Sequence, residues 1–101
     1  MPSRTPRLTP QTARVLDCLI AEAALSGVEI ARRTKLMSGT LYPLLIRLED
    51  AGWISSVWEQ ADPSELGRPR RRFYSMTNLG LAQVRTAAAD QLATLSRLAL
   101  S

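Results

Sequence analysis

Apolar residues recur at steps of three and four through the first half of the chain, which predicts three amphipathic helices. The first spans about 9–24 and begins at a Thr-Pro pair, which is typical of a helix N-terminus. The second spans 26–34, where Ser26 and Glu29 have the spacing of a capping box. The third spans 38–51, and its expected buried stripe is Leu41, Leu44, Leu45 and Leu48.

The pattern then changes from a helical period to the alternation of strands. Residues 53–59 and 70–77 are rich in β-branched and aromatic side chains and predict two paired strands. The polar segment between them, 60–69, contains prolines and a glycine and predicts a long loop. Thr77 can cap a last helix that continues nearly to Ser101.

The predicted order of elements is helix, helix, turn, helix, strand, loop, strand and long helix. This is the order of a winged helix-turn-helix followed by a C-terminal helix. The predicted fold class is therefore mainly α with a two-stranded β-hairpin (α+β). We expect a basic N-terminal arm over 1–8 that contains Arg4 and Arg7, a winged helix-turn-helix domain over 9–77, and a separate helix over 78–101.

Composition excludes several classes of protein. The 101 residues include no histidine, which excludes Ser-His-Asp triads and His-ligated metals. Cys18 is the single cysteine, so an intrachain disulfide is impossible, and one free thiol fits a cytoplasmic protein. No apolar run approaches the roughly 18 residues of a membrane span. Thirteen Lys and Arg against nine Asp and Glu give a charge of +4, which permits a polyanionic partner.

The exposed side of the third helix is a candidate DNA-binding surface. Hydroxyl groups near a helix N-terminus suit a phosphate, and a proline beside them suits a thymine methyl in the major groove. Two structural alternatives stay open: Ser38 merely caps the helix, and Tyr42 packs against the hairpin. The candidate contacts on this helix are Ser38, Gly39, Thr40, Tyr42, Pro43 and Arg47.

The loop between the strands carries a second candidate surface. Four arginines fall within five residues, and such a cluster on a wing suits the DNA backbone or minor groove. Strand alternation is expected to turn either Arg71 or Arg72 away. The acidic residues just upstream offer the alternative that this loop is only a solvated, internally paired segment. The candidate contacts here are Arg68, Arg70 and Arg71.

The last helix carries a longer apolar stripe than one small core needs, and an exposed stripe of that length would be a liability. We therefore expect two copies to pair about a two-fold axis, with the first helix contributing. Packing within its own domain is the alternative. Two half-sites would then lie about 34–36 Å apart on DNA. The expected dimerisation residues are Leu81, Val84, Ala88, Leu92, Leu95 and Ala99.

Several motifs of the chain together resemble those of a known family: SGVEI (26–30), SGTLYPLL (38–45), RLE (47–49), AGWI (51–54), GRPRRRFY (67–74) and MTNLG (76–80). They resemble the PadR family of bacterial winged-helix regulators, and in particular its short subfamily, which dimerises through one C-terminal helix. The resemblance implies a homodimeric repressor that binds a palindromic double-stranded DNA operator, and it adds a small-molecule effector as a candidate partner. Some short members of the family resemble multidrug sensors with an aromatic residue on the last helix. This sequence departs from that pattern, because no Phe, Trp or Tyr follows Tyr74.

Two other functions stay open at this stage: a winged-helix module for protein–protein interaction, and an architectural protein that binds all DNA alike. An enzyme is the weakest alternative, because neither a paired acid–base constellation nor a phosphate loop is visible in the sequence. We accordingly expect no catalytic residues, no cofactor and no metal site.

Overall fold

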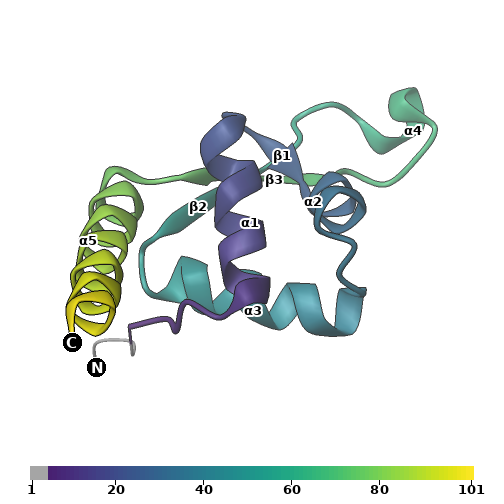
Figure 1. Ribbon diagram of the computed structural model, residues 1–101. Coiled ribbons are helices and arrows are strands. Elements are labelled where there is room, and N and C mark those ends of the chain that lie inside the picture. Colours follow the sequence, from purple (N-terminus) through teal and green to yellow (C-terminus); the bar gives the residue numbers. More distant parts are fainter. Residues whose placement is uncertain (1–4) are drawn as a thin grey trace.

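The computed structural model describes residues 5–101, so Met1 to Arg4 of the expected arm lie outside the described residues (Figure 1). The molecule is mainly helical with a small antiparallel sheet, which confirms the predicted winged helix-turn-helix with a long last helix. In chain order the elements are α1 (Pro10–Ala21), β1 (Leu25–Ser26), α2 (Gly27–Thr34), α3 (Ser38–Asp50), β2 (Ile54–Trp58), α4 (Pro63–Leu66), β3 (Arg72–Met76) and α5 (Asn78–Leu100).

Three helices begin at the hydroxyl caps that the sequence predicts. Thr9 accepts a hydrogen bond from the Thr12 amide at 3.2 Å, and Ser26 accepts one from the Glu29 amide at 3.2 Å. Thr77 does the same for the Gly80 amide at 2.9 Å. Each cap satisfies an amide that has no partner inside the helix, which fixes where the helix starts.

Two predictions about the elements are wrong: the end of the first helix and the number of strands in the sheet. Helix α1 ends at Ala21 rather than near residue 24, because the chain becomes extended at Glu22 to enter β1. The sheet has three strands in the order β1-β3-β2, not two. The additional strand, β1, pairs only Leu25 and Ser26 with β3, so it is too short to show an alternating pattern in the sequence.

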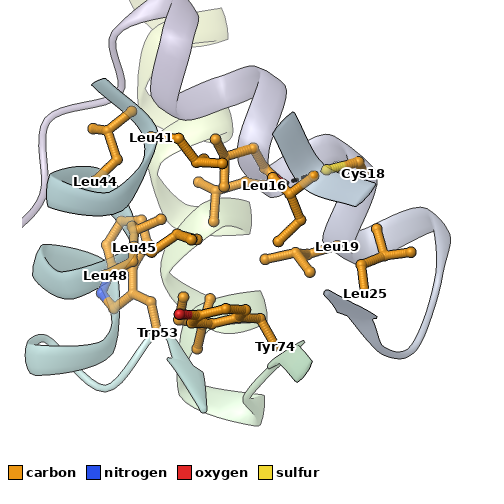
Figure 2. Packing of buried hydrophobic residues seen from close by; sticks show 13 residues of the cluster. Leu16, Cys18, Leu19, Leu25, Leu41, Leu44, Leu45, Leu48, Trp53 and Tyr74 are labelled. Atoms are coloured by element: carbon orange, nitrogen blue, oxygen red, sulfur yellow. Dashed lines mark hydrogen bonds between the residues drawn. The ribbon is translucent and has the colours of Figure 1, made fainter. Parts of the chain in front are cut away.

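The core lies where α1, α3 and the sheet meet, and Figure 2 shows leucines from both helices pointing at one another. The predicted stripe of α3 is buried at all four positions. Trp53 and Tyr74 close the cluster on the side of the sheet. Burying a leucine side chain contributes about 1.5–3 kcal/mol, so these contacts are the main source of stability.

Helix α5 is anchored only at its beginning. The Thr77 hydroxyl donates to the carbonyl oxygens of Gly52 at 2.6 Å and Trp53 at 3.0 Å. Leu81 is half-buried, and Val84 packs against the core, so the first two positions of the predicted stripe contact their own domain. Every residue from 88 onward is exposed. In Figure 1 this helix stands beside the domain, at the opposite end of the molecule from α4.

The long loop between β2 and β3 is more ordered than predicted. It contains the single-turn helix α4, which Asp62 caps by accepting from the Ser64 amide at 2.9 Å. Gly67 ends this turn with a left-handed φ of 68°, a conformation that a glycine adopts without strain. The wing therefore consists of β2, β3 and a capped tip (Figure 1).

Candidate nucleic-acid interface

The exposed side of α3 presents most of the residues predicted for it. Gly39, Thr40, Pro43 and Arg47 are all exposed. Ser38 is exposed as well, but it is not the helix cap. The amides of Thr40 and Leu41 both donate to the Met37 carbonyl at 2.9 Å, so Met37 is the N-cap and Ser38 is the first residue of the helix. The Ser38 hydroxyl is therefore not engaged in capping.

Sequence reasoning missed Ile46, which lies between Pro43 and Arg47 on the solvent side of α3 and is 60% exposed. It forms one apolar strip with Pro43, because residues three apart are neighbours on a helix surface. The signal was present in the sequence: Ile46 falls outside the buried leucine stripe. A strip of this kind fits base methyl groups better than phosphates.

Tyr42 is 41% exposed, and its ring lies on Gly27 at the start of α2. A β-carbon at Gly27 would stand 2.7 Å from the Tyr42 hydroxyl oxygen, so any larger residue there would displace the Tyr42 ring. Tyr42 also lines a hollow of about 370 Å³ between α2 and the wing, whose other walls include Arg70, Arg71 and Tyr74. The structure thus brings together predicted residues from α3 and from the wing.

The wing arginines have different environments. Arg68 makes two hydrogen bonds with the Glu59 carboxylate, at 2.7 and 3.1 Å, which holds the pKa of Glu59 below its ordinary value and raises the pKa of Arg68. Arg70 donates to the Ala61 carbonyl at 2.9 Å and fixes the wing tip. Within residues 5–101, the Arg71 side chain makes no ion pair or hydrogen bond. Arg71 is therefore the wing cation most available to a ligand.

Arg72 has partners that Arg71 lacks, although both line the hollow beside Tyr42. Its guanidinium contacts Glu49 of α3 at 3.2 Å and Ser56 of β2 at 2.6 Å. The Arg47 side chain, in contrast, lines a cavity of about 490 Å³ between the arm, α1 and α3, together with Arg7, Thr9 and Leu44. The two flanks of α3 thus differ: one contacts the wing and the other faces the arm.

Other chemistry is limited in the described part of the chain. Cys18 is buried, its thiol donates to the Val15 carbonyl at 3.1 Å, and burial raises its pKa. Residues 5–101 contain no group of three His, Cys, Asp or Glu side chains placed to hold a metal ion. Among the same residues, none of the helices is both long and apolar enough to span a membrane.

Helices α2 and α3 are joined by a short turn, α3 has an exposed side, and a β-hairpin follows it. This arrangement defines a winged helix-turn-helix protein. Residues 15–86 match the transcriptional regulator PadR-like family, and the chain belongs to this family. The resemblance drawn from the sequence motifs is therefore confirmed. The sequence matches no curated protein.

Several solved structures share the fold. A PadR family regulator from Eggerthella lenta DSM 2243 has a TM-score of 0.68 at 23% identity, covering 88% of this chain and 80% of that one. The YusO protein from Bacillus subtilis has a TM-score of 0.72 at 23% identity, covering 89% and 60%. AbfR of Staphylococcus epidermidis has a TM-score of 0.62 at 28% identity, covering 77% and 49%. The chain thus spans less than two thirds of YusO and AbfR.

Proposed function

We propose that the protein is a sequence-specific DNA-binding repressor that acts as a homodimer on a palindromic operator. The observation that carries the proposal is the shared hollow lined by Tyr42 of α3 and by Arg70 and Arg71 of the wing. A helix that enters the major groove and a basic wing beside it would contact one stretch of duplex together. The family, one of transcriptional regulators, supports the same function.

The proposed contacts on α3 divide by chemistry. The hydroxyls of Ser38 and Thr40 suit phosphate oxygens, and Gly39 lets the backbone approach the duplex closely. Pro43 and Ile46 suit thymine methyl groups, which carry sequence information. Arg47, on the flank toward the arm, is placed for a phosphate or a guanine edge.

The proposed dimer forms through α5. Leu92 is 66% exposed, and the leucines that follow it at 95, 98 and 100 are exposed as well. A monomer in water rarely leaves such a stripe uncovered, and a second copy of the same stripe is its simplest complement. Leu98, which the predicted stripe omitted, belongs to this surface beside Leu95 and Ala99. Half-buried Leu81 and Val84, which packs against the core, lie at the start of the helix and would join the dimer contact to the domain.

An effector that releases DNA is the remaining part of the proposal. The cavity of about 490 Å³ between the arm, α1 and α3 is large enough for a small molecule, and Arg47 lines it. A ligand held there would engage a side chain that the DNA also needs, so the two would compete. A screen for compounds that release labelled operator DNA from the protein tests this part. Leu44→Phe fills the cavity, so the effector site is refuted if the releasing compounds act equally on this variant.

Fluorescence anisotropy tests DNA binding and the role of the wing. Genomic DNA fragments are first selected by their binding to the protein at about 150 mM salt. The protein is then titrated against these retained fragments and against scrambled duplexes of equal length. Arg71→Ala removes one cation per protomer, so in a dimer the salt slope should flatten by about two units. Arg97→Ala, on α5, is the matched control: it removes the same charge far from the wing and should leave the slope unchanged.

Each alternative function has its own outcome in this titration. Equal binding to retained and scrambled duplexes would indicate an architectural DNA binder. No binding to either would favour a protein-interaction module. An unchanged slope for Arg71→Ala would remove this side chain from the interface.

Sedimentation tests the dimer. Leu92→Asp places a charge in the proposed seam and should give a monomer that no longer binds the operator tightly. Thr86→Asp is the control, because this exposed residue lies on the other side of α5. If Leu92→Asp remains dimeric, this part of α5 is not the seam.

A further inference from the structure

Three side chains from three elements form a closed hydrogen-bonded triangle at the base of the wing. The Arg72 Nε atom donates to Ser56 Oγ at 2.6 Å, and Ser56 Oγ donates to Glu49 Oε2 at 2.6 Å. Arg72 Nη2 closes the triangle on Glu49 Oε1 at 3.2 Å. Glu49 lies near the end of α3, Ser56 in the middle of β2, and Arg72 at the start of β3.

Aromatic rings hold the same guanidinium from the sheet side. The Arg72 guanidinium carbon lies 5.6 Å from the centre of the Trp58 ring and 5.9 Å from that of Tyr74. Trp58 is paired directly with Arg72 across β2 and β3, and Tyr74 is buried. Contacts at these distances attract a cation to the ring face. The Arg72 guanidinium thus has partners on α3 and on the sheet, whereas the side chain of its neighbour Arg71 has no hydrogen bond or ion pair among the described residues.

This triangle is the outermost tie between the wing and α3. Ile54 and Tyr74 pack into the core at the inner end of the strands, whereas Val57 and Trp58 near the tip are exposed. The third strand, β1, pairs with β3 only as far as Phe73, so beyond that residue the triangle connects the two wing strands to α3. A two-stranded ribbon by itself is marginally stable and free to change its angle.

We propose that Arg72 is a positioning residue that, through Glu49 and Ser56, sets the angle between the wing and α3 so that both reach the same DNA site. This inference rests on the proposed DNA-binding function. The competing role is a direct contact between Arg72 and a phosphate, since its side chain is 41% exposed.

The isosteric variant Glu49→Gln separates the two roles by the sign of its effect. If Arg72 positions the wing, loss of the ion pair loosens the triangle and weakens operator binding by about fivefold to tenfold, in the range of coupled contacts. If Arg72 binds phosphate, the same change frees its guanidinium and removes a negative charge near the polyanion. Binding would then become tighter.

The experiment measures operator affinity and its salt dependence for Arg72→Gln, Glu49→Gln and the double variant. We expect the two single variants to weaken binding similarly, the double variant to be no weaker than either, and the salt slope to stay unchanged. Arg72→Lys should not restore affinity, because an ammonium cannot reproduce the fork that joins Ser56 and Glu49. A flatter salt slope for Arg72→Gln, or tighter binding by Glu49→Gln, would overturn the proposal.

Hydrogen exchange of the free protein provides a readout that needs no DNA. Arg72→Gln and Glu49→Gln should speed amide exchange in the outer wing, 57–72, while the amides of α1 keep their protection. Arg33→Gln is the matched control: it breaks the 2.7 Å ion pair with Glu22, away from the wing, and should leave wing exchange unchanged. Unaltered wing exchange in both triangle variants would refute the tie. If the wild type binds no DNA, the proposed function fails and this measurement still decides about the triangle.

Discussion

Substituting Gly80 by alanine should destabilise the protein, although alanine is the better helix former. Gly80 lies in the first turn of α5, against the backbone of Trp53. A β-carbon there would overlap the Trp53 carbonyl oxygen and stand 2.8 and 2.9 Å from its carbonyl carbon and Cα. Since non-bonded carbons prefer about 3.5–4.0 Å, α5 would have to move away by at least about 0.7 Å to relieve the contact with the carbonyl carbon.

The magnitude follows from two opposing effects. Alanine in place of glycine gains about 1 kcal/mol of helix propensity. Overpacking against rigid backbone costs about 1–3 kcal/mol. Moving the helix also weakens the bonds from Thr77 to the carbonyls of Gly52 and Trp53, at about 1 kcal/mol each. The net expectation is a loss of about 2–4 kcal/mol in the free energy of unfolding.

Urea denaturation followed by circular dichroism measures this loss, with all variants at one protein concentration because a dimer's stability depends on it. With a typical denaturant dependence, the midpoint should fall by about 1–2 M. Gly39→Ala is the matched control, since no described atom lies within 4 Å of a β-carbon built there, and its midpoint should stay or rise. A midpoint for Gly80→Ala at or above that of the wild type would refute the close packing of α5 against the Trp53 backbone.

Two further predictions concern titratable groups. Because Arg68 lowers the pKa of Glu59, this pair stabilises the wing tip at pH values above about 4.5, and the contribution disappears as the pH falls through the lower, folded pKa. A carbon-13 NMR titration should show the Glu59 pKa rising in Arg68→Gln, and equal values in both proteins would contradict the pairing. Burial raises the pKa of Cys18, so a thiol reagent at pH 8 should label the native protein on the order of 100-fold more slowly than the urea-unfolded chain. Comparable labelling rates would show that Cys18 is accessible.

Periodicity was sufficient to predict most of the fold. The leucine stripe of α3, the three hydroxyl caps and the change to strand alternation each reflect local chemistry that the sequence displays directly. Strand β1 was missed because a pair of residues has no period, and its pairing with β3 depends on contacts distant in the sequence. The cap of α3 is Met37 rather than Ser38, and it was not evident because Met37 makes no side-chain capping hydrogen bond.

The candidate site was harder to predict than the fold, because residue type does not reveal pairing. Arg68 and Arg71 look equivalent in the sequence, yet the Arg68 side chain pairs with the Glu59 carboxylate and the Arg71 side chain does not. Whether an arginine at the wing meets a carboxylate depends on the fold of the loop. Arg72 was expected only as one of two alternating side chains, and its partner Glu49 lies 23 residues away. Ile46, in contrast, was accessible to sequence reasoning, since it falls outside the buried stripe.

Hydroxyl-radical footprinting of the wild-type protein on a retained genomic fragment tests site-specific binding by a two-fold dimer most directly. The proposal predicts two protected regions of equal shape, related by a two-fold axis and separated by about one helical turn, 34–36 Å. The protection should persist at about 150 mM salt, where non-specific binding is weak. Uniform protection along the fragment, or a single unpaired region, would contradict the account.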